Sequence, residues 1–391
     1  MLHFLFIDDK LIDLLTVEEK PSGGAAVQAL GWVKGLQDEG HRVSIVTRTS
    51  PGQKLKQEFE DLDLIPFYDD NKGIKKIRWA TYRLPYFYKI FKEVRPDYVY
   101  VGIPSWSTFY FALMCKALGI KLIVRISSDG LVDNRILSKY SKSHKFLQAM
   151  GLSLSETILC QNEYQLAQIQ KRFPNKKTVK LSNPIFPYTP PVNLGMPKNA
   201  IVWLGLFKPE KNLKLLFEIA TLMPEQEFVV AGKEEKNINS ITRAYVKQLK
   251  TLPNVKFIGF LQRHEVLPVL AQAKFLLNTS HYEGFSNTFL EAMYVGTPII
   301  SSGRVNPDGI ISTHKLGIIY ATREDLQLQL ESLDTKKYDK MRSHCLDYIS
   351  AHHNHRLLTQ KLLAFLENRP FINVEIQKDG KKEKALPDMA S

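Results

Sequence analysis

The strongest constraint in this chain is an alternation of strands and helices that occurs twice and is interrupted once by prolines. Short apolar segments such as 2–8, 41–48 and 121–127 alternate with stretches that have helical periodicity. Residues 184–199 contain five prolines in sixteen positions, which excludes a regular helix or strand there. The alternation restarts at residue 200. Repeated β-α-β units predict parallel sheets that are covered by helices on both faces.

This pattern predicts an α/β protein with two doubly wound, Rossmann-like domains. We expect a first domain over residues 1–183, a proline-rich linker over 184–199 and a second domain over 200–345. A C-terminal helix at 346–368 is expected to return to the first domain, and the polar tail at 369–391 is expected to be disordered. Ligands of such sheets bind beyond the carboxyl ends of the strands, so a cleft between the domains is the expected site.

The composition favours an anionic partner. The formal net charge is +13, which suits nucleotide phosphates, nucleic acid or an anionic membrane surface. The N-terminus, MLHFLFIDDK, lacks the basic start and long apolar core of a secretory signal. The best apolar run, at 106–115, has about half of the ~20 residues that a membrane-spanning helix needs. Cys115, Cys160 and Cys345 show no metal-ligand spacing and indicate packing roles in a reducing, cytoplasmic compartment.

The segment HYEGFSNTFLEAMYVGTPII, residues 281–300, places two glutamates around a predicted helix start. Ser286 is the expected N-cap, and Gly296 with Pro298 marks the helix end. The NH groups of the first helical turn lack intrahelical partners and form an anion site. A carboxylate would repel phosphate, but it accepts hydrogen bonds from neighbouring sugar hydroxyls, which suits Glu283 and Glu291. The alternative is a capped helix with two structural glutamates.

This segment resembles the E-x7-E motif of the family 4 (group 1) glycosyltransferases, which have the GT-B fold. Three further stretches resemble the same family: PSGGAAVQALGWVKGLQDEGHRVSIVT, WLGLFKPEKNLKLLFEIA and LSNPI. The stretch VNPDGII is similar to the branch that makes exopolysaccharide and lipopolysaccharide. The resemblance covers roughly residues 1–368 and implies transfer of a sugar from a nucleotide donor.

The resemblance implies a role for each matching residue. Glu291 would hold the nucleotide ribose and Glu283 the donor sugar, while Lys211 would neutralise the leaving diphosphate. Gly23 and Gly24 match the glycine loop at the first helix, and Gly205 matches the glycine after the first strand of the donor domain. The backbone NH groups of the helix start would bind the diphosphate and sugar; they belong to Phe285, Ser286, Asn287 and Thr288.

The chain departs from the family pattern at two places. Leu206 stands where the family commonly has an arginine, and Lys208 is the nearby cation, although lysine lacks the bidentate fork of arginine. The usual His-Asp pair is replaced by RISSDG, which leaves Asp129 to orient an acceptor hydroxyl or to cap the next helix. The family mechanism is mostly retaining and needs no metal or other cofactor. We therefore interpret Asp61-Leu62-Asp63 as surface and His352–His355 as a polar helix face.

The basic charge includes a segment, 72–94, with seven Lys or Arg, six aromatics and one acid. We expect it to form a surface of the protein that faces the acceptor or lies on an anionic bilayer. The alternative is a helix with aromatics in the core and solvated lysines. No nucleic-acid-binding pattern appears. The residues of the expected surface are Lys75, Lys76, Arg78, Trp79, Tyr82, Arg83, Phe87 and Lys89.

The sequence thus predicts a glycosyltransferase that uses a nucleotide sugar, most simply a UDP-sugar, with a glycan or lipid-linked acceptor. The expected reaction proceeds with retention, in cell-surface polysaccharide or glycolipid synthesis, in the cytoplasm or at the inner face of the membrane. Two alternatives stay open. One is a sugar-nucleotide 2-epimerase, which would need more acid and base groups in the cleft. The other is a non-catalytic scaffold, which would be consistent with Leu206 in place of the usual arginine.

Overall fold

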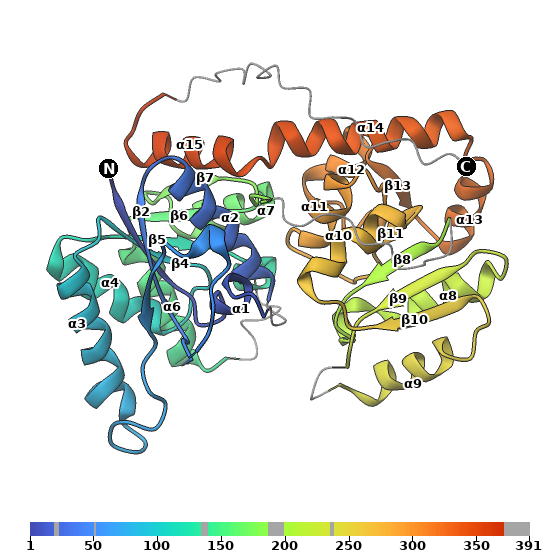
Figure 1. Ribbon diagram of the computed structural model, residues 1–391. Coiled ribbons are helices and arrows are strands. Elements are labelled where there is room, and N and C mark those ends of the chain that lie inside the picture. Colours follow the sequence, from blue (N-terminus) through green and yellow to red (C-terminus); the bar gives the residue numbers. More distant parts are fainter. Residues whose placement is uncertain (19–22, 51, 134–139, 187–198, 235–237, 371–391) are drawn as a thin grey trace.

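The computed structural model describes residues 1–18, 23–50, 52–133, 140–186, 199–234 and 238–370. These residues form two α/β domains that lie side by side (Figure 1). The first sheet has seven strands in the order β3-β2-β1-β4-β5-β6-β7, and the second has six in the order β10-β9-β8-β11-β12-β13. Every pairing between neighbouring strands is parallel. The predicted α/β class with two doubly wound sheets is confirmed.

The strands are short and largely buried, as parallel strands covered on both faces must be. In the first domain they are β1 His3–Ile7, β2 Arg42–Thr47, β3 Asp63–Pro66, β4 Tyr98–Val101, β5 Lys121–Arg125, β6 Thr157–Cys160 and β7 Lys177–Lys180. In the second domain they are β8 Ile201–Leu204, β9 Phe228–Ala231, β10 Val255–Gly259, β11 Phe275–Leu277, β12 Ile299–Ser302 and β13 Gly317–Tyr320.

Helices cover both faces of each sheet. In the first domain they are α1 Ile12–Leu15, α2 Gly24–Asp38, α3 Leu84–Val94, α4 Ser107–Leu118, α6 Lys142–Leu154 and α7 Glu163–Arg172. In the second they are α8 Leu213–Leu222, α9 Ser240–Leu249, α10 Arg263–Gln272, α11 Asn287–Tyr294, α12 Ile310–Thr313 and α13 Arg323–Glu331, followed by α14 Thr335–His352 and α15 His355–Leu366. Single turns are η1 Gln57–Phe59, η2 Trp79–Arg83, η3 Asp129–Leu131, η4 Pro209–Lys211 and η5 Pro307–Gly309.

The last two helices lie along one side of the molecule, with α14 over the second domain and α15 over the first (Figure 1). Leu358 and Leu362 of α15 share a core with Trp32 and Leu36 of α2. Gly35 of α2 allows this contact, because a Cβ at that position would collide with Thr359. The proposed tail lies almost wholly at 371–391, and the proposed linker largely at 187–198; both stretches are outside the described residues.

Between α14 and α15 the chain passes from the second domain to the first, and there residues 353–354 lie against residues 183–185. We call these two segments together the hinge. His353 is fully buried there, and its Nδ1 lies 2.8 Å from the Asn183 carbonyl oxygen. The His353 carbonyl in turn accepts a hydrogen bond from the Ile185 NH at 2.9 Å. His355 places its Nε2 2.9 Å from Asp38 Oδ2 in α2. The interpretation of the histidine cluster as a polar surface face is therefore wrong for these two residues, because interdomain packing covers them.

Candidate functional site

The two helices that the sequence placed at the site begin opposite each other. Asn287, the first residue of α11, donates a hydrogen bond from Nδ2 to the Gly24 carbonyl oxygen at 2.9 Å. Gly23 is the N-cap of α2 and has open space around it. The tertiary structure therefore brings the glycine loop of the first domain to the EGFSN turn of the second, residues that stand more than 250 positions apart.

Lys211 and Glu283 form an ion pair in the second domain. Glu283 also accepts a hydrogen bond from Ser280 Oγ at 2.9 Å. Lys211 ends the turn η4, and its carbonyl oxygen accepts from Thr279 Oγ1 at 2.8 Å. These bonds tie the loop after β8 to the loop after β11, so both charges lie at the carboxyl ends of adjacent parallel strands.

The start of α11 has the geometry of an anion site. Ser286 is the N-cap with an extended backbone, and its side chain makes no capping bond to the helix. Its hydroxyl instead lies 2.8 Å from Thr288 Oγ1. Phe285 is 8% exposed and packs in the core, so it positions the turn through its backbone. The positive end of the helix dipole therefore faces the Gly24 side of the cleft.

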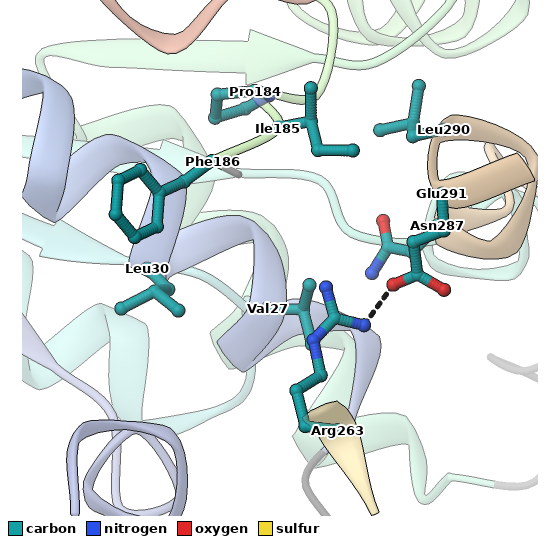
Figure 2. Close-up of a pocket in the computed structure, with 9 residues that line it drawn as sticks. All are labelled: Val27, Leu30, Pro184, Ile185, Phe186, Arg263, Asn287, Leu290 and Glu291. Atoms are coloured by element: carbon teal, nitrogen blue, oxygen red, sulfur yellow. Dashed lines mark hydrogen bonds and ion pairs between the residues drawn. The ribbon is translucent and has the colours of Figure 1, made fainter. Parts of the chain in front are cut away.

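Glu291 lies one turn further into α11 and is 3% exposed. It forms an ion pair with Arg263, the first residue of α10 (Figure 2). Val27 and Leu30 of α2 and residues 184–186 close the same space, which has a volume of only about 20 Å³. Arg263 was not predicted from the sequence as a site residue. The available signal was its position at a helix start shortly after β10, but its partner Glu291 lies 28 residues further along the chain.

Asp129 approaches the same site from the first domain. Its Oδ1 accepts hydrogen bonds from Asn162 Nδ2 at 3.0 Å and Gln165 Nε2 at 2.8 Å. Asn162 Nδ2 also lies 3.4 Å from the Gly284 carbonyl oxygen. Asp129 and Glu283 line one cavity of about 280 Å³ between the domains. The cavity is walled chiefly by polar groups, which suits a ligand that carries hydroxyls. Its other lining residues are Asn162, Tyr164, Tyr282, Gly284, Arg304, Val305, Asn306, Pro307 and Asp308.

Two further residues that the sequence predicted for the site, Gly205 and Lys208, lie at the turn after β8. Lys208 is the N-cap of η4, and its Nζ is 4.0 Å from Glu210 Oε1. Gly205 donates its NH to the Ala231 carbonyl oxygen at 3.1 Å. Leu206 is partly buried between them. A direct ion pair joins Glu283 to Lys211.

The basic segment does not form one continuous surface. Phe87 is 1% exposed and belongs to the core, so its expected place on a surface is wrong. Arg83 pairs with Asp70 at 3.1 Å and stacks over Tyr68. Trp79 and Tyr82 pack against the same core, and Arg78 is partly buried. The periodicity of α3 turns Phe87 and Phe91 inward, whereas Tyr88 is 42% exposed. The side chains of Lys75, Lys76 and Lys89 are exposed.

Two further expectations concern metals and membranes. Among the described residues, no group of three His, Cys, Asp or Glu side chains has the arrangement of a metal site. Within the same residues, every helix is too short or too polar to cross a membrane. The three cysteines are buried and unpaired by disulfides, which agrees with packing roles.

Family models identify the chain. A model of glycosyltransferase family 4 matches residues 22–186, and a model of glycosyl transferases group 1 matches residues 189–350. Together they cover both domains. The chain therefore belongs to the family 4 (group 1) glycosyltransferases and is an enzyme of that class. No match was found among curated proteins.

Solved structures share the fold at low identity. Sucrose-phosphate synthase from Thermosynechococcus elongatus is 16% identical with a TM-score of 0.71, and the match covers 94% of this chain and 99% of that chain. HepE from Anabaena, in complex with UDP and glucose, is 14% identical with a TM-score of 0.69 and coverages of 94% and 100%. WaaG, a glycosyltransferase involved in lipopolysaccharide biosynthesis, is 16% identical with a TM-score of 0.65, and the match covers 92% of this chain and 98% of that chain. These similarities confirm the GT-B fold.

Proposed function

We propose that this enzyme transfers a sugar, with retention, from a UDP-sugar to a glycan or lipid-linked acceptor. The observation that carries the proposal is the Lys211–Glu283 ion pair beside the uncapped start of α11, with Glu291 one turn further along. This order suits a ligand that presents sugar hydroxyls, then phosphates, then ribose hydroxyls. HepE, which has the same fold, was crystallised with UDP and glucose, which supports a uridine nucleotide here.

The charges suit the departure of a nucleoside diphosphate. When the bond between the sugar C1 and the phosphate oxygen breaks, negative charge accumulates on the diphosphate. Lys211 and the NH groups at the α11 N-terminus stabilise that charge in place, which lowers the barrier. The acceptor oxygen forms the new bond to C1 on the same face, and its proton passes to the leaving phosphate oxygen. Glu283 holds the donor sugar by its hydroxyls, and no step in this scheme calls for a metal or another cofactor.

Asp129 is proposed to orient the reacting sugar or acceptor hydroxyl. Its carboxylate is fixed by two amide donors, from Asn162 and Gln165, and it faces Glu283 across one cavity. A carboxylate held in this way accepts a hydroxyl proton in a hydrogen bond without moving. Gly23 and Gly24 would leave room for the diphosphate and the acceptor near the start of α2.

A thermal-shift screen with UDP, UDP-sugars, GDP-sugars and ADP-sugars tests the donor class. A ligand that binds only the folded state increases the free energy of unfolding by mass action, by about 2.7 kcal/mol at a hundred times its dissociation constant, and so raises the thermal midpoint. We expect UDP and UDP-sugars to shift the midpoint, and the Lys211→Ala variant to reduce that shift. Absence of any shift with UDP compounds would contradict the uridine assignment.

We propose that the enzyme works in cell-surface polysaccharide or glycolipid synthesis, in the cytoplasm at the inner face of the membrane. The loop before α3 supports this location, because Ile74 and Ile77 are 62% and 52% exposed and flank the exposed Lys75 and Lys76. Basic side chains next to exposed apolar ones bind anionic bilayers. Co-sedimentation with phosphatidylglycerol vesicles at low salt should be lost in the Lys75→Glu, Lys76→Glu double variant. Equal sedimentation of both proteins, or of neither, would contradict this location.

A further inference from the structure

A second cavity lies wholly in the first domain, at the carboxyl ends of its central strands. It has a volume of about 260 Å³ and begins where β1 ends at Ile7 and where β4 ends at Val101. Gly23 and the first turn of α2 form one of its walls. The next residue, Gly24, contacts Asn287 of α11, so this cavity adjoins the donor site. We call it the Asp8 cavity.

Carboxylates provide the polar side of the Asp8 cavity. Asp8 and Asp9 line it together with Lys10. Asp8 is partly buried, and its Oδ1 accepts a hydrogen bond from the Lys10 NH at 2.9 Å. Asp9 faces Arg48, with 3.4 Å between its Oδ2 and the arginine Nε. Arg48 also donates a hydrogen bond from Nη1 to Asp70 Oδ2 at 2.6 Å. The cavity is therefore more acidic than basic, although the chain as a whole carries a formal charge of +13.

The ionised form of Asp8 is costly where it stands. Burial raises the pKa of the Asp8 carboxyl to about 6. Of the neighbouring charges, Asp9 and Asp13 raise this pKa as well, and the backbone NH groups of Lys10 and Leu11 lower it. A buried carboxylate gains most from a ligand that brings hydrogen-bond donors, because its remaining lone pairs are poorly hydrated.

Aromatic rings provide the apolar side of the same cavity. Phe67, Trp79, Phe87 and Phe111 line it. Trp79 begins a π-helical turn, Trp79–Arg83, and packs edge-on against Trp106 with 4.6 Å between ring centroids. Single π-helical turns are rare and often occur at functional sites, because they redirect one side chain. This turn presents a partly buried tryptophan to the cavity.

We infer that the Asp8 cavity binds the terminal sugar ring of the acceptor, and that it selects a neutral or amino sugar over an acidic one. This inference rests on the proposed function. An apolar ring face stacks on Trp79 and its neighbours, while hydroxyl or ammonium groups donate hydrogen bonds to Asp8 and Asp9. An anionic sugar or a phosphate would place its charge against two carboxylates. The cavity is slightly smaller than the about 300–1,000 Å³ of pockets for drug-sized ligands, which suits one sugar ring.

Isothermal titration of the full chain with three p-nitrophenyl glycosides tests this inference, using those of glucose, glucosamine and glucuronic acid. We expect the glucoside and the glucosaminide to bind at least tenfold more tightly than the glucuronide. Asp8→Asn should weaken binding of the glucosaminide at least tenfold and narrow its advantage over the glucuronide. The exposed Asp61→Asn serves as the matched control and should change none of the three.

Trp79→Phe and Trp79→Ala test the aromatic side of the cavity. Trp79→Phe should retain stacking and most of the affinity, while Trp79→Ala should lose it for all three glycosides. The thermal shift caused by UDP should stay the same in every variant, because neither Asp8 nor Trp79 belongs to the proposed donor site. The inference is overturned if no glycoside binds, if the glucuronide binds as tightly as the others, or if Asp8→Asn binds as the wild type does. Loss of the UDP shift in the wild type would instead overturn the proposed donor.

Discussion

At the scale of single residues, the roles proposed for Lys211 and Glu283 would let two opposite charges bind one substrate of mixed character. The carboxylate alone would repel a diphosphate, and the ammonium alone would leave the sugar hydroxyls without an acceptor. Their ion pair keeps both side chains in place while each keeps an edge for the ligand, since both are only partly buried. Pairing in the free enzyme therefore preorganises the two groups for binding.

Replacement of Lys211 by alanine should reduce kcat by about 10²–10³, the usual effect of removing one donor that stabilises developing charge. The fold should be retained, because the side chain is 22% exposed and lies at the end of a single turn. Steady-state transfer assays and far-ultraviolet circular dichroism would measure the two effects. Lys214→Ala is the control, since Lys214 is 59% exposed in a nearby helical pair with Glu218. A Lys211→Ala enzyme with more than half of the normal kcat would contradict the assignment.

Arg263→Ala should lower the free energy of unfolding by about 3 kcal/mol, because it leaves Glu291 as a buried charge without its guanidinium partner. The Michaelis constant for the donor should rise as well, since Glu291 would no longer be held in the position proposed for binding the ribose. Urea denaturation measures the stability change. The exposed pair Arg243–Glu234 provides the comparison, and Arg243→Ala should cost less than about 1 kcal/mol. Equal losses in the two variants would refute the role of Arg263.

Asp8→Asn should stabilise the protein at pH 7 by up to about 3 kcal/mol, since the pKa of Asp8 is about 6 in the folded protein and 3.8 for an unperturbed aspartate. Between pH 3.8 and about pH 6 the folded state holds a proton that the unfolded state has lost, so rising pH lowers the free energy of unfolding of the wild type. The amide variant carries no such charge. Its advantage should disappear at pH 4 in urea denaturation. An equal advantage at pH 4 and pH 7 would show that burial of charge is not the cause.

At the scale of elements, α14 and α15 decide how the two domains are joined. Between them, His353 forms hydrogen bonds with Asn183 and Ile185 in the other segment of the hinge. Arg125 at the end of β5 extends this contact, because it is buried and its Nη2 lies 2.6 Å from Asn183 Oδ1. The hinge is thus held by buried hydrogen bonds, which have well-defined geometry, rather than by apolar packing alone.

Acid should weaken this hinge through His353. Burial lowers the pKa of His353 to about 4, whereas the unfolded chain binds a proton near pH 6.5. Below pH 6.5 the unfolded state therefore binds a proton at His353 that the folded state does not bind. The free energy of unfolding falls as a result, until about pH 4. The contribution is about 3 kcal/mol. His353→Gln should flatten the fall between pH 7 and pH 4 in urea denaturation, and an unchanged pH profile would contradict this.

Element prediction succeeded where a segment's own residues decide its structure. The N-cap at Ser286 and the stop at Gly296 were predicted, and the structure has Ser286 as the N-cap of α11 and a left-handed Gly296. The strands β7 (KTVK) and β13 (GIIY) were missed, because each is four residues long and the first is polar. Such short sequences become strands only through pairing with β6 and β12.

At the scale of the whole molecule, the domains are held together around the cleft. Asp308 of η5 has a left-handed backbone, and its Oδ1 accepts a hydrogen bond from the Glu163 NH at 2.9 Å, at the start of α7. Its Oδ2 lies 3.1 Å from Lys180 Nζ. These bonds join the second domain to the first. The space beside Glu291 holds only about 20 Å³, far less than a nucleoside needs, so the donor site proposed above would admit its nucleoside only if α2 moved away from α11.

Asp308→Ala should favour separation of the domains. A hydrogen bond to a charged group contributes about 1.5 kcal/mol, so its loss should shift the equilibrium roughly tenfold toward an open form. Small-angle X-ray scattering of the free enzyme should show a larger radius of gyration, which UDP should reduce again. Asp339→Ala, an exposed carboxylate in α14, is the control. Identical scattering from Asp308→Ala and the wild type would contradict this role of Asp308.

The sequence alone determined the parallel α/β class, the division into two domains and the position of the E-x7-E segment at a helix start. Periodicity and the Gly and Pro positions carry that information, because they act within one element. Only the tertiary structure decided that Arg263 pairs with Glu291, that His353 is buried at the hinge and that Phe87 lies in the core. Each of these depends on which distant segment covers a side chain, and burial and charge pairing are properties of the packed molecule rather than of local sequence.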